Sequence, residues 1–191
     1  MTLQVDYAAE RTWSRIVGGL RSARLNAGIS QNALSVGLPV RGRAISEWES
    51  RAIEPTLEHL LQWSRELGQR LVIIGRDGEL RTGPARPRPG EAWEVSERRR
   101  LAAPLRNRRL ALGWGQAELG KLVGVSRDSI QRWELVHVPP RPIAHVVWAQ
   151  SLGYSLDVRP ITESTPRLGH AGCASAGRAA DDPGFYAQQH G

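Results

Sequence analysis

Residues 105–140 read LRNRRLALGWGQAELGKLVGVSRDSIQRWELVHVPP, and this stretch decides the fold because the chain carries a second version of it. The other version lies 85 positions earlier, at residues 20–55, as LRSARLNAGISQNALSVGLPVRGRAISEWESRAIEP. Extended to their ends, the two copies are Leu20–Ile73 and Leu105–Val158, which align without a gap and are identical at 16 of 54 positions. This self-similarity predicts two equivalent structural units in tandem.

The local signals within a copy predict four helices followed by a strand. In the first copy a helix ends at Gly28, and Ser30 is suited to cap a short helix over residues 31–36. A second short helix is expected at about 41–50, where apolar side chains recur at helical spacing. Thr56 is suited to cap a last helix that ends at residue 67. The second copy repeats this layout, with Ser126 as the cap of its second short helix.

A helix, a short turn and a second helix, wrapped by two further helices, is the layout of a helix-turn-helix domain. Both copies resemble the Xre family of phage-repressor-like helix-turn-helix domains, whose pattern is roughly LR..R...G.SQ..LA...GVS...I...E.....P....L...A..LG. The resemblance covers 108 of the 191 residues. It implies a mainly α fold of two tandem repressor-like helix-turn-helix bundles, each followed by a short β-strand or hairpin.

Three residues depart from the family pattern, all in or beside turns. Arg51 and Val136 stand where the family has glycine, two residues after its glutamate. Pro39 occupies the position that is Gly124 in the second copy. These departures predict unusual turns and a first copy that has drifted further from DNA binding than the second.

The edges of the copies predict the domain organisation. We expect a first domain at 1–82 with a C-terminal β-hairpin, a Pro/Arg-rich linker at 83–92, a second domain at 93–161 with a C-terminal strand, and a disordered tail at 162–191. The second domain should begin with a helix near Ser96, with Glu97 in its first turn. The runs at 70–74 and 155–159 are predicted to pair within one chain as a pseudo-dimer. The alternative is that each hairpin only caps its own domain.

The second helix of such a motif enters the major groove, where arginine can bind guanine and glutamine can bind adenine. These pairings suit several side chains of the two recognition helices, although the same residues would also suit a solvated helix face. The predicted base-facing residues are Arg41, Arg43, Ser46 and Glu47 in the first copy and Ser126, Arg127, Asp128, Gln131 and Arg132 in the second.

The family resemblance implies further roles outside the recognition helices. Gln31 and Gln116 would contact phosphate, and Arg21 and Arg106 are placed to add phosphate contacts. Two ion pairs, Arg24 with Glu49 and Arg109 with Glu134, would tie the first helix of each copy to its recognition helix. The apolar tryptophans at repeat-equivalent positions, Trp48, Trp63, Trp133 and Trp148, are predicted to be core residues.

Composition adds weaker evidence. The net charge of +7 favours a polyanionic partner, but nearly all basic residues are arginine, a bias that a GC-rich genome also produces. Cys173 is the single cysteine, which excludes an intrachain disulfide and a cysteine-based zinc site. No signal peptide or membrane span is evident, so we expect a cytoplasmic protein.

Enzyme motifs are missing from the sequence as well. The five histidines show no metal spacing, and there is no phosphate loop or catalytic triad, so we expect no enzyme and no cofactor. His59 and His145 are expected at the surface or half-buried.

These observations predict a sequence-specific double-stranded DNA-binding transcription regulator, a repressor acting alone as a pseudo-dimer or as a homodimer. The alternative is an antitoxin-like or other protein-interaction component with autoregulatory DNA binding, in which the strands or the tail bind a protein partner. A third possibility is that the first copy serves only for dimerisation beside a DNA-binding second copy.

Overall fold

The first copy folds into four helices in the computed structural model. They are α1 (Tyr7–Asn26), α2 (Gln31–Gly37), α3 (Gly42–Glu49) and α4 (Leu57–Glu66). The structure describes residues 2–38, 40–84 and 86–161, so the tail predicted at 162–191 and Pro39 lie outside the described residues. The side chains of Ser30 and Thr56 accept hydrogen bonds from backbone N–H groups three residues later, as predicted for helix caps.

The second copy repeats this arrangement. Its helices are α5 (Trp93–Ala111), α6 (Gln116–Val123), α7 (Arg127–Glu134) and α8 (Pro142–Ser151). Ser126 caps α7 by accepting a hydrogen bond from the backbone N–H of Ser129 at 3.1 Å. The predicted start near Ser96 was wrong, because α5 begins at Trp93. Glu97 therefore lies in the second turn of α5, where it is fully buried.

Tryptophan pairs form the centre of each copy, as predicted. Trp48 packs against Trp63 with ring centroids 5.8 Å apart, and Trp133 packs against Trp148 at 5.6 Å. All four belong to the buried core, in which they contact the leucine and isoleucine side chains of the surrounding helices. The recognition helices α3 and α7 are each fixed to this core by one tryptophan and one isoleucine.

One antiparallel pair of strands joins the two copies. β1 (Gln69–Ile74) follows α4, and β2 (Ser155–Pro160) follows α8. The predicted pairing within one chain is confirmed, and its register is symmetric: Val72 pairs with Asp157, which is its own equivalent 85 residues later. The 85-residue repeat relates each pair on one side of this central pair to a pair on the other side: Arg70–Arg159, for example, corresponds to Ser155–Ile74. A pseudo-two-fold axis therefore passes through the sheet.

The predicted hairpin in the first copy is reduced to a tight turn. After β1 the chain turns back at Gly75, whose N–H donates to the carbonyl oxygen of Glu79 at 2.9 Å. A single bridge joins Ile74 to Leu80, and no longer strand follows it within the described residues. The turn thus extends the edge of the sheet without forming a second ribbon.

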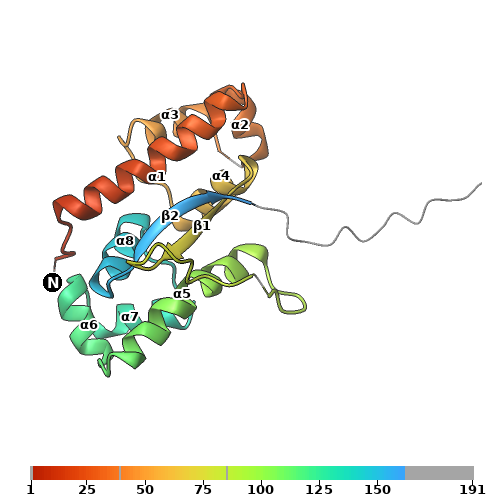
Figure 1. Cartoon of the computed structure of the whole chain (residues 1–191). Coiled ribbons are helices and arrows are strands. Elements are labelled where there is room, and N and C mark those ends of the chain that lie inside the picture. Colours follow the sequence, from red (N-terminus) through yellow and green to blue (C-terminus); the bar gives the residue numbers. More distant parts are fainter. Residues whose placement is uncertain (1, 39, 85, 162–191) are drawn as a thin grey trace, which may run out of the picture. The chain divides into compact units, whose positions relative to one another are not determined.

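Helix packing between the copies follows the same pseudo-symmetry. Helix α1 packs on α8, and its equivalent α5 packs on α4. In Figure 1, α1 and α5, α2 and α6, and α3 and α7 lie on opposite sides of the β1–β2 pair. The described residues therefore form one compact unit that holds two recognition helices.

Buried polar contacts make the interface between the copies specific. The carboxylate of Glu97 accepts hydrogen bonds from Arg70 of β1 and from Arg100, with Nε–Oε2 distances of 3.0 Å in both cases. Burial alone would raise the pKa of Glu97, but these two guanidinium groups outweigh it and lower that pKa. Glu54 of the first copy accepts a hydrogen bond from the backbone N–H of Ile143 at 2.6 Å, and so caps α8 of the second copy.

The N-terminal segment adds a contact that reaches from the first copy to the second. The N–H of Gln4 donates to the carbonyl oxygen of Val123 at 3.0 Å, at the end of α6. The chain passes so close that a Cβ on Gly124 would lie 2.1 Å from the carbonyl oxygen of Thr2. Glycine is required there for a second reason, since its φ is +83°.

Candidate nucleic-acid interface

The predicted base-facing side chains lie on the outward faces of α3 and α7 and at their N-caps. In α3, Ile45 and Trp48 point into the core, which leaves Arg43 and Ser46 facing solvent. In α7, Ile130 and Trp133 do the same. The predicted residues are exposed at Arg41, Arg43, Ser46, Ser126, Arg127, Asp128 and Arg132, and half-buried at Glu47 and Gln131.

A buried ion pair fixes each recognition helix to the first helix of its copy. Arg24 binds Glu49 through two parallel hydrogen bonds, Nε to Oε1 at 2.6 Å and Nη2 to Oε2 at 2.8 Å. Arg109 binds Glu134 with the same two distances. Each arginine also donates to a backbone carbonyl oxygen five residues later, at 2.7 Å. The orientation of each recognition helix is therefore set by a bidentate pair in addition to apolar packing.

The pKa shifts in the first copy agree with this geometry. The hydrogen bond to Glu49 raises the pKa of Arg24. Burial alone would raise the pKa of Glu49, but the hydrogen bonds from Arg24 and Gln31 outweigh it and lower that pKa. Arg21 adds a smaller electrostatic effect in the same direction, which places its charge near the ion pair.

The two glutamines predicted to contact phosphate also take part in these ion-pair networks, which sequence reasoning missed. Gln31 Nε2 donates to Glu49 Oε2 at 2.8 Å, and Gln116 Nε2 donates to Glu134 Oε2 at 2.9 Å. A side-chain amide has two N–H donors, so one remains on each glutamine after this bond. The phosphate role of Gln31 and Gln116 stays a prediction, and the network would hold the remaining donor in a fixed direction.

The recognition helices differ in charge. In α3, Arg43 forms an ion pair with Glu47 one turn later, at 2.8 Å, so its charge is partly neutralised. In α7, no ion pair within the described residues involves Arg127 or Arg132. Among the described residues, the second copy therefore presents two arginines without an ion-pair partner, whereas the first presents Arg41 without one and Arg43 paired with Glu47.

The turns after the recognition helices take the left-handed conformation although they lack glycine. Arg51 and Val136 both have φ of +62°, and they are repeat equivalents. A non-glycine residue there is strained, and a β-branched valine more so than arginine. The two departures from the family pattern thus place residues with side chains in a backbone conformation that favours glycine.

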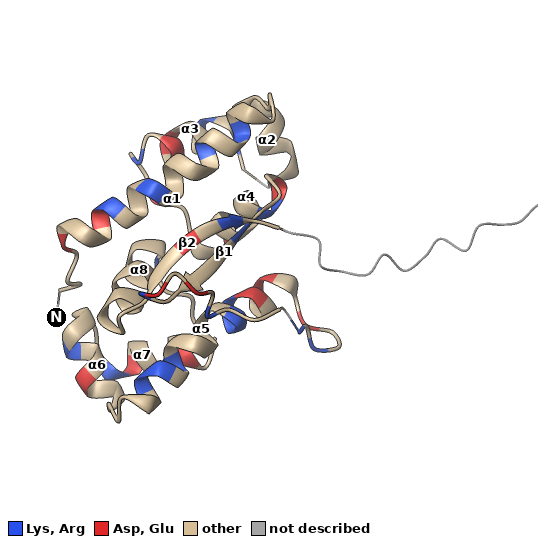
Figure 2. Cartoon of the chain, viewed as in Figure 1, with Lys and Arg blue, Asp and Glu red and all other residues tan. Residues whose placement is uncertain are grey.

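An open groove of about 580 Å³ lies beside the end of α7, and sequence reasoning did not find it. Arg106, predicted to contact phosphate, lines this groove together with Arg88, Arg99 and His137. Arg88 comes from the segment that was interpreted only as a linker, so its Pro/Arg composition was the available signal. Figure 2 shows that basic residues recur along α1 and α5, the helices that carry Arg21 and Arg106.

A family model described as a helix-turn-helix matches the chain twice, at residues 20–74 and 105–158. These ranges run from the C-terminal third of α1 to the end of β1, and from the C-terminal third of α5 into β2. The chain belongs to the helix-turn-helix family. It is a tandem member, with two Xre-like copies in one polypeptide. No curated protein and no solved structure matches the chain.

Membership of the helix-turn-helix family makes this a DNA-binding protein and identifies α2–α3 and α6–α7 as its two motifs. Within the described residues, none of the helices of this helix-turn-helix protein is long and apolar enough to cross a membrane.

Proposed function

We propose that this protein is a transcription regulator, a repressor that occupies a double-stranded operator with both recognition helices of a single chain. The observation that carries the proposal is the symmetric register of β1 and β2, centred on Val72 and Asp157. In two-fold helix-turn-helix dimers the recognition helices enter successive major grooves, about 34 Å apart along the duplex. The symmetric register supports the proposal that α3 and α7 enter successive major grooves in the same way.

The operator should not be a palindrome, because the two reading surfaces differ. The first copy presents RGRAISE at 41–47, and the second presents SRDSIQR at 126–132. Arg127 or Arg132 would bind guanine through O6 and N7, and Gln131 would bind adenine through N6 and N7. Each such pair discriminates against other bases by roughly 1–3 kcal/mol.

The second copy should carry most of the base discrimination. Its arginines are free of ion pairs among the described residues, whereas Arg43 would have to give up Glu47 to bind guanine. Because one of the two base-facing arginines of the first copy is already paired, α3 should bind its half-site more weakly. The phosphate contacts proposed for Arg21 and Arg106 would add affinity without sequence preference.

Protein-interaction alternatives are less well supported. They would need a partner to bind strands 70–74 or 155–159 or the tail at 162–191. The two strands already pair with each other, and the tail lies outside the described residues. We also propose that the protein acts by binding and not by catalysis.

Selection of bound sequences from random double-stranded DNA tests the proposal. The wild type should select two unlike half-sites, Arg127→Ala should lose the base preference of one, and Arg43→Ala should weaken the other. Arg11→Ala is the matched control, since it removes one exposed positive charge from α1 outside both motifs. Selection of a single half-site that Arg43→Ala leaves unchanged would mean that the first copy serves only for dimerisation. No enrichment at all would contradict the proposal.

A further inference from the structure

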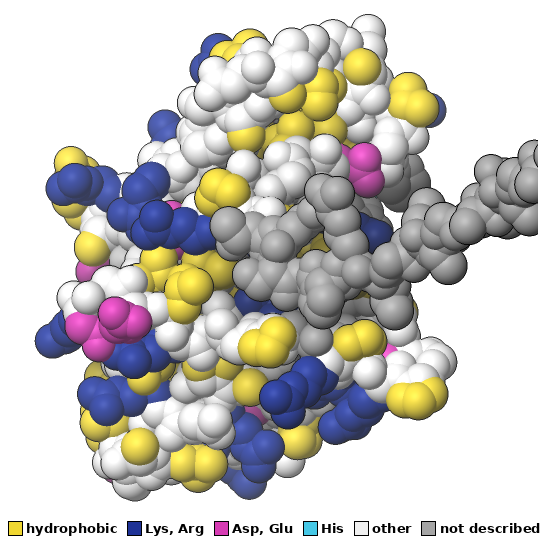
Figure 3. Space-filling model, turned by 45° about the vertical axis from the view of Figure 1, so that its right-hand side comes forward, with side chains coloured by type: hydrophobic (Ala, Val, Ile, Leu, Met, Phe, Trp, Pro, Cys, Tyr) yellow, Lys and Arg dark blue, Asp and Glu magenta, His cyan; other side chains and the backbone are white. Residues whose placement is uncertain are grey.

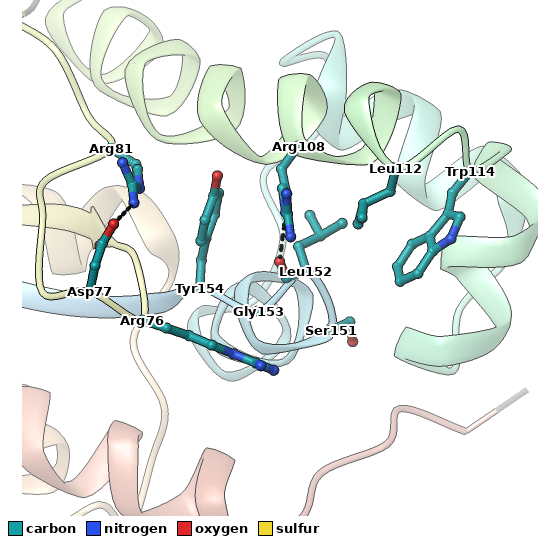
Figure 4. Close-up of a pocket in the computed structure, with 10 residues that line it drawn as sticks. All are labelled: Arg76, Asp77, Arg81, Arg108, Leu112, Trp114, Ser151, Leu152, Gly153 and Tyr154. Carbon is teal, nitrogen blue, oxygen red and sulfur yellow. Dashed lines mark hydrogen bonds and ion pairs between the residues drawn. The ribbon is translucent and has the colours of Figure 1, made fainter.

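A pocket of about 430 Å³ lies away from the two reading surfaces, where the turn after β1 meets the ends of α5 and α8 (Figure 4). The first copy contributes Arg76, Asp77 and Arg81, and the second contributes Arg108, Trp114 and Tyr154. We call it the arginine pocket. Its volume is within the usual range for sites that bind small molecules, roughly 300–1,000 Å³.

The charge of the pocket is positive even after its negative groups are counted. Three guanidinium groups face one carboxylate, that of Asp77, which gives about two positive charges. The N–H of Glu79 and, to a smaller extent, Arg81 lower the pKa of Asp77, so it is ionised at neutral pH. The ends of α5 and α8 each add about half a negative charge. Roughly one positive charge therefore remains without compensation.

The arginines differ in how far their hydrogen bonds are used. Arg81 pairs with Asp77. Arg108 Nε makes a long bond of 3.4 Å to the carbonyl oxygen of Leu152, which leaves its terminal nitrogens for another acceptor. Arg76 has no ion pair within the described residues and lies along the floor of the pocket, beneath Tyr154 (Figure 4).

The opposite end of the pocket is apolar. Figure 4 shows the Trp114 ring and Leu112 at the end away from Asp77, with the Tyr154 ring between Arg81 and Arg108. The two guanidinium carbons lie 5.8 and 5.9 Å from the centre of the Tyr154 ring. The pocket thus combines a cationic end with flat apolar walls.

Figure 3 shows arginine and hydrophobic side chains interspersed over one face of the molecule, with no single large apolar patch.

A glycine in the turn after β1 allows Arg81 and Asp77 to lie close to the backbone there. A Cβ on Gly75 would lie 2.6 Å from Nε of Arg81 and 2.5 Å from the carboxylate of Asp77. At Gly153, whose φ is +77°, a Cβ would lie 3.4 Å from Nε of Arg76, which is an ordinary contact. A side chain at Gly75 would displace the turn's ion pair from the pocket wall.

The repeat does not require this pocket. The equivalents of Arg108, Trp114 and Tyr154 in the first copy are Ala23, Ile29 and Gln69. The charged and aromatic groups therefore exist on one side of the pseudo-two-fold axis only. Residues that merely maintained the helix-turn-helix fold would be expected in both copies.

We propose that the arginine pocket binds a small anion that carries a planar ring, of about the size of a nucleoside monophosphate. The anionic group lies between Arg76 and Arg108, and the ring packs against Trp114 and Leu112. Because the pocket is lined from both copies, the bound ligand also links the β1 turn to α5 and α8. The inference does not depend on DNA binding.

Isothermal titration calorimetry on the full chain tests the proposal with three probes: adenosine monophosphate, guanosine monophosphate and indole-3-acetate. At least one of the three probes should bind. The separate parts of that probe should each bind at least about tenfold more weakly. For the anion these parts are inorganic phosphate or acetate, and for the ring they are adenosine, guanosine or indole. Arg76→Gln should weaken binding by about tenfold or more, whereas Arg11→Gln, with the same loss of charge, should not.

Two results would overturn the proposal. One is that none of the three probes binds at concentrations up to roughly 1–10 mM. The other is that the affinity is equal in the wild type and in Arg76→Gln, which would mean that the arginines serve only the ends of α5 and α8. DNA selection with the same variants is a separate readout, so failure here leaves the proposed function to its own test.

Discussion

His145 of α8 provides a prediction whose size follows from the structure. Its side chain is 1% exposed, and neither ring nitrogen has a hydrogen-bond partner within the described residues. The ring packs on Trp148 with centroids 5.4 Å apart. Because no partner compensates for the loss of water, burial lowers the pKa of His145 to about 4.

This shift makes folding stability depend on pH. In an unfolded chain histidine has a pKa of about 6.5, so between about pH 4 and 6.5 the unfolded state binds more protons than the folded state. The free energy of unfolding should be at its full value above pH 6.5 and should fall by about 1.4 kcal/mol per pH unit below it. By about pH 4 the loss from this one residue amounts to roughly 3 kcal/mol.

His145→Leu isolates the effect, because the equivalent residue in the first copy is the fully buried Leu60. Leucine does not titrate, so at pH 5 the variant should be about 2 kcal/mol more stable relative to the wild type than it is at pH 7. Urea unfolding followed by tryptophan fluorescence at pH 5, 6, 7 and 8 measures this difference. Losses from buried carboxylates are common to both proteins and cancel.

The exposed His137 supplies the control, since His137→Gln should leave the pH profile of the wild type unchanged. If His145→Leu and the wild type differ by the same free energy at every pH, the reasoning is refuted. That result would mean that His145 accepts a proton in the folded protein at little cost.

Three further predictions concern stability and salt. Arg24→Ala should lower the free energy of unfolding by about 3–5 kcal/mol, because it leaves the Glu49 carboxylate buried without its partner; a loss below about 1 kcal/mol in urea unfolding would contradict this. Arg51→Gly should raise the free energy of unfolding by about 1 kcal/mol, because glycine adopts a φ of +62° without strain. Ser50→Gly is the control and should lower the free energy of unfolding, because Ser50 has a φ of −82°. Both effects are measured as changes in the urea midpoint, and equal effects would count against backbone strain. Arg106→Ala should reduce the slope of log affinity for DNA against log salt by about one, and an unchanged slope would exclude a phosphate contact.

The sequence predicted the repeated parts of this protein well because the signals there are local or symmetric. Caps such as Ser30 and Ser126 depend on residues three positions away, and the inward face of α7 follows from helical spacing. The pairing of β1 with β2 follows from symmetry once both copies end in a strand. When two equivalent units each end in a strand, pairing the two strands with each other is one of the few arrangements that satisfies the backbone hydrogen bonds of both.

What the sequence did not predict depends on contacts between distant residues. His145 was expected at the surface or half-buried, but it is buried because its neighbours on α8 are covered by the other copy. The start of α5 was placed too late because Glu97 was interpreted as a first-turn residue, whereas it lies in the second turn and pairs with Arg70 in the buried interface. The arginine pocket joins residues from both copies and has no motif in the sequence.

The most direct test of the central claim is a hydroxyl-radical footprint of the protein on its selected operator, at a stoichiometry of one chain per duplex. We expect two protected blocks on one face of the duplex, with centres about 34 Å apart, and loss of one block in Arg43→Ala or Arg127→Ala. A single protected block that is unchanged in Arg43→Ala, or a second block that appears only when a second chain binds, would contradict the account.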